Sequence, residues 1–104
     1  MSEIAKGFYY HYKHNPERGI NNYAYEVLNV AHHTEMEDFT AAAMVIYRPL
    51  YEAKVYTVGK HWDARPLVMF VEKVTIKNEQ GESLLKDRFT KINDPKVISE
   101  LKKI

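Results

Sequence analysis

The sequence of 104 residues contains no cysteine, only four glycines and no long hydrophobic run. The absence of cysteine excludes disulfides, zinc–thiolate sites and thiol nucleophiles. The glycines, at positions 7, 19, 59 and 81, are too scattered for a phosphate-binding loop or a dinucleotide motif. The longest apolar run, 41–47, is too short to cross a bilayer, and residues 1–6 do not resemble a signal peptide. We therefore expect a cytoplasmic protein that makes no membrane contact.

Neither sign of charge predominates, since the net charge of the chain is only +1. It is unevenly divided, because residues 1–52 hold four Lys or Arg against seven acids, whereas residues 53–104 hold eleven against seven. Nucleic-acid binding through the basic second half is therefore an alternative, but an unfavoured one, because recruitment of nucleic acid usually needs a larger excess. The length and the 45% hydrophobic content predict a single domain spanning residues 1–104.

Aromatic residues are abundant, with eight tyrosines, four phenylalanines and one tryptophan, and most lie in short segments with Val, Ile and Thr. This mixture is typical of β-strands and predicts a mainly β fold. The individual strands are predicted from alternation and from turn residues at 8–12, 23–30, 44–47 and 54–58, followed by a hairpin of 71–77 and 84–92 closed by 78–81. Within the second strand, Val27 and Asn29 are expected on one face and Leu28 and Val30 on the other.

The C-terminal segment changes to a helical pattern. Asp94 is a suitable N-cap, Pro95 suits the first turn, and Val97, Ile98 and Leu101 are spaced to share one face. A helix over 94–104 is too short to persist alone in water, so its apolar face is expected to dock on the sheet.

The stretch from Trp62 to Phe70 is the most informative part of the chain, because it places a cation between an indole and a proline. Pro66 fixes its own φ and favours extended backbone at Arg65, so the guanidinium is presented from a pre-organised chain. The five donors of Arg65 suit a carboxylate or phosphate, and the cation is able to stack on Trp62. The structural alternative is an internal salt bridge from Arg65 to Glu26 or Glu35.

Several residues appear in an order that resembles the bacterial domain of unknown function 1653 family. They are Gly7, Tyr9, His11, Tyr12 and Lys13, then Tyr25, Glu26, Val27, Leu28, Val30 and Ala31 with His33, Thr34 and Glu35, then Val45, Tyr47, Arg48, Leu50 and Tyr51, and finally Trp62, Arg65, Pro66, Leu67, Met69 and Phe70. Arg88 and Phe89 form a fainter last match. The resemblance implies a cytoplasmic protein with a small SH3-like β-barrel or roll of five or six strands over 7–92, and no assigned activity.

These observations favour a binding module without catalytic residues or a cofactor, whose ligand is a peptide or a small anion. The predicted contact surface is lined by aromatic and charged side chains, namely Tyr9, His11, Glu35, Tyr47, Trp62 and Arg65. The sequence gives no indication of the oligomeric state.

A metal-dependent hydrolase is the enzymatic alternative, because imidazole and carboxylate together suit zinc or iron. Strand alternation separates His32 from His33, but His33 and Glu35 can share a face, with His11 or His61 completing a set of ligands. No serine lies on a nucleophile elbow, so an acyl-enzyme mechanism is not expected.

Overall fold

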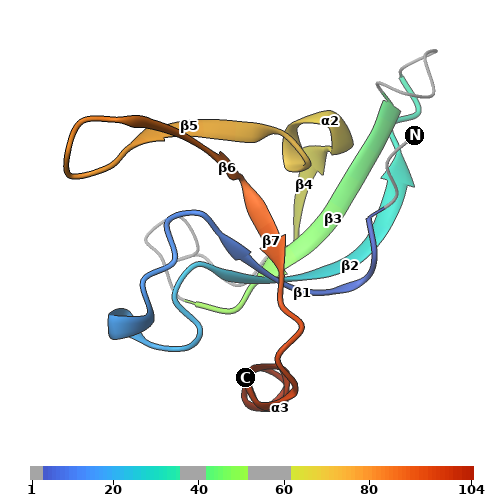
Figure 1. The fold of residues 1–104 in the computed structure, drawn as a ribbon. Helices are drawn as coiled ribbons and strands as arrows, with labels where there is room; N and C mark the ends of the chain where they lie inside the picture. The colour runs from blue at the N-terminus through green and yellow to red at the C-terminus, as the bar shows by residue number, and fades with distance from the viewer. Residues whose placement is uncertain (1–3, 36–41, 52–61) are drawn as a thin grey trace.

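The computed structural model describes residues 4–35, 42–51 and 62–104, in which seven strands form two antiparallel sheets (Figure 1). The larger sheet has the order β4-β3-β2-β1-β7 and consists of β1 (Gly7–His11), β2 (Ala24–His32), β3 (Ala43–Pro49), β4 (Asp63–Pro66) and β7 (Phe89–Lys91). The smaller sheet is a hairpin of β5 (Lys73–Lys77) and β6 (Ser83–Asp87). The helices are η1 (Pro16–Arg18), α2 (Leu67–Phe70) and α3 (Pro95–Leu101). The predicted strand at 54–58 lies outside the described residues.

Both faces of the larger sheet are covered, because successive residues of its strands point to opposite sides and both sets are apolar. We call the side covered by α2 the inner face; its buried cluster consists of Tyr9, Tyr25, Val27, Val45, Tyr47, Leu67, Phe70 and Phe89. The outer face carries a second buried cluster under α3, made of Phe8, Ala24, Leu50, Ile92 and Leu101. The sheet is therefore the middle layer of the protein.

The two edges of the larger sheet meet across its inner face. The chain passes from edge strand β4 directly into α2, whose Phe70 ring stacks on Phe89 of the other edge strand, β7. The ring centroids are 4.1 Å apart and the planes are parallel within 1°. Tyr25 and Tyr47 contact the Phe89 ring edge-on, with centroids 5.6 Å and 5.9 Å away. Figure 1 shows that the sheet is curled, and these aromatic contacts join its two edges across the inner face.

The mainly β fold with a short C-terminal helix is confirmed, but the sheet is not a closed barrel. Across the described residues, no backbone pairing joins β4 to β7. The segment 84–92, predicted as one strand, is interrupted at Arg88, so that β6 pairs only with β5 while β7 pairs with β1. The hairpin thereby leaves the larger sheet instead of closing it.

The alternation predicted for the second strand is wrong after Val27, because β2 contains a β-bulge. Val27 pairs with Tyr47 and Val30 pairs with Val45, and the register shifts between Val27 and Asn29. An extra residue in a bulge resets which side chains share a face. Val30 therefore lies on the same face as Val27 and not opposite to it.

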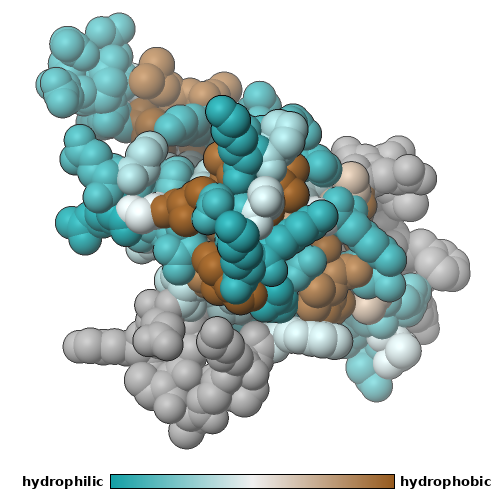
Figure 2. Space-filling model, turned by 90° about the horizontal axis from the view of Figure 1, so that it is seen from below, coloured by the Kyte–Doolittle hydropathy of each residue, from teal (hydrophilic) through white to brown (hydrophobic). Residues whose placement is uncertain are grey.

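Helix α3 begins and docks as its sequence predicts. Asp94 Oδ1 accepts a 2.9 Å hydrogen bond from the backbone N–H of Lys96, and Pro95 occupies the first turn. Val97 and Ile98 pack against the outer-face cluster, in which Leu101 is completely buried. Seen from the side of α3, Figure 2 shows a mainly hydrophilic central surface with hydrophobic atoms on either side of it.

The β5–β6 hairpin projects from the sheet and is closed by the predicted turn. Asn78 Oδ1 accepts hydrogen bonds from the backbone N–H groups of Gln80 and Glu82, and Gly81 adopts a φ of +79°. Leu85 on β6 is 71% exposed. Among the described residues, no helix is long and apolar enough to span a membrane.

Docking of α3 predicts that Leu101→Ala lowers the free energy of unfolding by about 2–5 kcal/mol, because truncation leaves a cavity in a packed cluster. Urea unfolding followed by circular dichroism measures this loss. The matched control is Leu85→Ala, whose exposed side chain is expected to change stability by no more than about 0.5 kcal/mol. Equal losses in the two variants would contradict the docking of α3.

Candidate functional site

The candidate site lies where several strand ends meet on the inner face. His11 ends β1 and pairs with Phe89, the first residue of β7, while Asp63 begins β4 opposite Tyr47. The turn before β2 contributes Tyr23. Antiparallel pairing therefore brings segments that are far apart in sequence to one corner of the sheet.

Arg65 extends over this corner from β4. Its backbone is in a strand, as Pro66 predicts, and it pairs with Val45. The guanidinium carbon lies 5.7 Å from the centroid of the Phe89 ring, and Nε donates a long, 3.4 Å hydrogen bond to Tyr47 Oη. Arg65 is partly exposed and forms no ion pair with another described residue. The proposed internal salt bridge of Arg65 is therefore not observed.

Glu26, one of the two candidate partners of Arg65, forms an ion pair with Arg48 instead. The Nε of Arg48 donates to Glu26 Oε1 at 2.7 Å, and the two residues are direct cross-strand neighbours on β3 and β2. Because they alternate with Val27 and Tyr47, this pair lies on the outer face. The sheet thus separates the Glu26–Arg48 ion pair from Arg65.

His11 is surrounded by rings and by cations. Tyr12, Tyr23 and Phe89 all have ring centroids within 5.5 Å of the imidazole centroid. The backbone N–H of Lys13 donates to Nδ1 at 3.2 Å, so the neutral imidazole carries its proton on Nε2. The pKa of His11 is lowered from 6.5 to about 4, first by burial of the imidazole and then by the positive charges of Lys13, Arg65 and Arg88.

Arg88 joins this group from the point where the chain leaves the hairpin. Its Nη2 donates to Glu72 Oε1 at 2.7 Å, and its backbone N–H donates to the Glu72 carbonyl. The Tyr12 backbone N–H donates to the carbonyl of Arg88 at 2.9 Å. The Nε atom of Arg88 is buried and has no hydrogen-bond partner among the described residues. We call His11, Lys13, Arg65 and Arg88 the donor cluster.

Tyrosine rings continue from the donor cluster along the strand ends. Tyr23 adopts a φ of +52°, an unusual conformation for an aromatic residue, and its ring lies between His11 and Tyr51. Tyr51 and Tyr25 share a hydrogen bond between their hydroxyl groups. Burial raises the pKa of Tyr51, and the nearby negative charge of Asp63 raises it further. We call Tyr12, Tyr23 and Tyr51, which are all partly exposed, the ring wall.

The predicted contact surface is brought together only in part. Tyr9 and Tyr47 lie on the inner face with His11 and Arg65, but both tyrosines are buried in the core. Burial raises the pKa of Tyr9, whose hydroxyl donates to the Ala5 carbonyl at 2.7 Å.

Trp62 and Glu35 do not join the donor cluster. Trp62 is 70% exposed, and the ring under the Arg65 guanidinium is Phe89, so the stacking expected on Trp62 is wrong. Glu35 follows the C-terminal end of β2, whereas the donor cluster lies near its N-terminal end. The strand from Tyr25 to His32 is about 23 Å long, so Glu35 is remote from the cluster.

The expected metal ligands are also separated. His32, His33 and Glu35 are exposed at the end of β2 that is remote from Tyr25 and His11. His61 lies outside the described residues. Within residues 4–35, 42–51 and 62–104, no group of three potential His, Cys, Asp or Glu ligands comes together.

The sequence-based surface omits several residues of the site, namely Lys13, Arg88 and its partner Glu72, and the ring-wall residues Tyr12, Tyr23 and Tyr51. Arg88 lies in a segment that alternates as one strand, and no local signal marks the break there. Tyr23 lies next to Asn21 and Asn22, which favour left-handed backbone, and this turn pattern is the one available signal for its unusual φ.

The matched part of the chain contains the whole donor cluster. Residues 7–91 match the family described as "Protein of unknown function (DUF1653)". The chain belongs to this family. No curated protein and no solved structure matches the chain.

The low pKa of His11 predicts a loss of stability in acid. Between pH 6.5 and about 4 the unfolded chain binds a proton at His11 that the folded chain excludes, so this contribution to stability decreases as the pH falls. His11→Gln should flatten this dependence, measured as the difference in urea unfolding free energy between pH 7 and pH 4.5. His33→Gln, which replaces an exposed histidine, is the control. An unchanged difference in His11→Gln would contradict the assignment.

Proposed function

We propose that this member of the family is a binding module for a small anionic ligand, which it takes at the donor cluster. The main support is Arg65, which is partly exposed, held over an aromatic ring and not neutralised by an ion pair within the described chain. The proposal includes no catalytic step.

The groups around Arg65 are hydrogen-bond donors and therefore favour a ligand that accepts hydrogen bonds. Arg65 and Arg88 supply guanidinium N–H groups, and His11 supplies Nε2–H because its Nδ1 already accepts from the backbone. Among the described residues, Arg65 donates only through its Nε, in a long bond to Tyr47, so its terminal N–H groups remain for a ligand. Planar guanidinium groups recognise carboxylate and phosphate oxygens in pairs, and their bonds to anions are among the strongest hydrogen bonds in proteins.

The fixed position of Arg65 also favours binding. Strand pairing to β3 and the following Pro66 restrict its backbone, and the Phe89 ring supports the side chain from below. A donor held in place before binding loses little conformational entropy when the ligand arrives.

A peptide ligand receives less support than a small anion. A peptide groove would use several exposed aromatic side chains beside Arg65. Tyr9 and Tyr47 instead belong to the core, and Trp62 makes no contact with Arg65 among those that the structure describes. Nucleic-acid binding stays a prediction of the basic second half, and a steep salt dependence would identify it.

Arg65→Gln is expected to weaken binding of acetate or inorganic phosphate about 10- to 100-fold, since a hydrogen bond to a charged group contributes about 1.5–3 kcal/mol. Affinity is measured by titrating 15N-labelled protein at constant ionic strength and following the amide signals of His11, Arg65 and Arg88.

Arg18→Gln is the matched control, because it removes the same charge from the exposed helix η1. It should bind both anions like the parent protein. Dispersed amide spectra establish that each variant is folded. If the two variants bind equally, or if no saturable shift occurs at these amides in the parent protein, the proposed function is wrong.

A further inference from the structure

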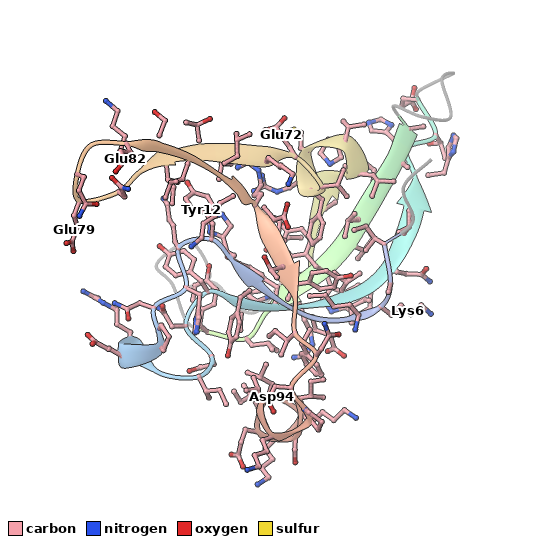
Figure 3. All side chains as sticks on the ribbon, in the orientation of Figure 1. Lys6, Tyr12, Glu72, Glu79, Glu82 and Asp94 are labelled. Atoms are coloured by element: carbon pink, nitrogen blue, oxygen red, sulfur yellow. The ribbon has the colours of Figure 1, made fainter. Side chains whose placement is uncertain are left out.

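The donor cluster has aromatic neighbours that a simple anion site does not need. Tyr12 and Tyr23 both approach the imidazole of His11, with ring centroids 4.4 Å and 5.5 Å away. Tyr51 extends the row beyond Tyr23 at 5.4 Å. Figure 3 places Tyr12 at the end of β1 beneath the β5–β6 hairpin, and Glu72 at the base of that hairpin. The ring wall and the donor cluster thus adjoin one another on the inner side of the sheet.

Tyr23 has a strained backbone conformation, and its contacts with His11 hold its ring in this row. A positive φ costs an aromatic residue on the order of 1–3 kcal/mol, and such residues persist where their surroundings fix them. The Tyr23 carbonyl accepts from the His11 backbone N–H at 3.0 Å, and the Tyr23 ring stacks on the imidazole with planes 28° apart. Both contacts join the wall to the donor cluster.

The charges at the site limit the charge of a ligand. Three permanent cations, Arg65, Arg88 and Lys13, surround the uncharged imidazole of His11. Glu72 neutralises Arg88, and Asp63 lies two residues before Arg65 on the same face of β4. Among the described residues at the site, these three cations and two carboxylates leave an excess of one positive charge, which matches a carboxylate ligand. A phosphate monoester, with close to two negative charges at pH 7, would exceed it.

We propose that the anion taken by the donor cluster is a carboxylate carried on a flat aromatic ring, with the carboxylate at Arg65 and the ring against Tyr12 and Tyr23. This inference rests on the proposed function and specifies its ligand. A flat ring packs on tyrosine faces in offset or edge-on geometry, which a puckered ring of equal size cannot adopt. The same two groups, a carboxylate and a flat ring, occur directly bonded in free aromatic acids and joined through the α and β carbons in a peptide that ends in an aromatic residue.

The test compares benzoate, cyclohexanecarboxylate, acetate and inorganic phosphate in amide-signal titrations of the full chain. Benzoate is expected to bind about three- to tenfold more tightly than cyclohexanecarboxylate, although the saturated ring is the more hydrophobic one. N-acetyl-L-phenylalanine separates the two sources of ligand: tighter binding than benzoate identifies a peptide C-terminus, and weaker binding identifies a free aromatic acid.

Tyr23→Leu should reduce the ratio of benzoate to cyclohexanecarboxylate affinity to about one. Tyr12→Leu provides the same test if the backbone at position 23 does not tolerate leucine. Tyr10→Leu is the matched control, because Tyr10 packs against the outer-face cluster, and it should keep the ratio of the parent protein.

Two results would overturn the inference while leaving the proposed function intact. One is Arg65-dependent binding in which benzoate is no tighter than cyclohexanecarboxylate, and the other is tighter binding of phosphate than of benzoate. Absence of saturable binding by all of these anions would overturn both proposals.

Discussion

The stacking of Phe89 on Phe70 is the contact on which the rest of the structure depends. Phe89 belongs to edge strand β7, and Phe70 belongs to the helix that follows the opposite edge strand, β4. Two parallel rings therefore hold together edges that backbone hydrogen bonds do not join within the described chain. The same Phe89 ring lies under Arg65 and beside His11. Core packing and the placement of the donor cluster thus share one side chain.

This arrangement explains the electrostatic character of the site. Curling of the sheet brings together cations from β4, from the residue that precedes β7 and from the turn that follows β1. The neighbouring charges and the burial keep His11 uncharged, so it acts as a hydrogen-bond donor and not as a cation at neutral pH. Glu72 and Asp63 offset most of the remaining charge. Within the described part of the chain, the corner is consequently richer in N–H groups than in net charge.

Local sequence signals predict the elements well where those elements depend on neighbouring residues. Asp94 and Pro95 begin the C-terminal helix, Asn78 and Gly81 close the hairpin, and Pro66 keeps Arg65 extended. These features need only a cap, a turn residue or a restricted φ, so a short window of sequence contains the necessary information.

The remaining features depend on contacts between distant segments. The break at Arg88 is fixed by Glu72 and by the stacking of the next residue on Phe70, neither of which alternation reveals. Likewise, Arg65 stacks on Phe89 and not on Trp62, its neighbour in sequence, because the curl of the sheet decides which ring lies under it. The sequence-based surface therefore contains Arg65, His11 and Tyr47 but not Phe89, Arg88 or Tyr23, which lie around them.

The side-chain contact between the two sheet edges has a mechanical consequence. Separating β4 from β7 breaks no backbone hydrogen bond between them, so the roll is able to widen at this seam while every described strand keeps its pairing. The resistance to widening comes from the aromatic contacts, which are short-ranged and are lost within a small displacement, and from the hydrogen bonds of Arg88 to Glu72. The seam runs beside Arg65, whose guanidinium lies over Phe89, so widening it would move the ring that supports Arg65 away from β4.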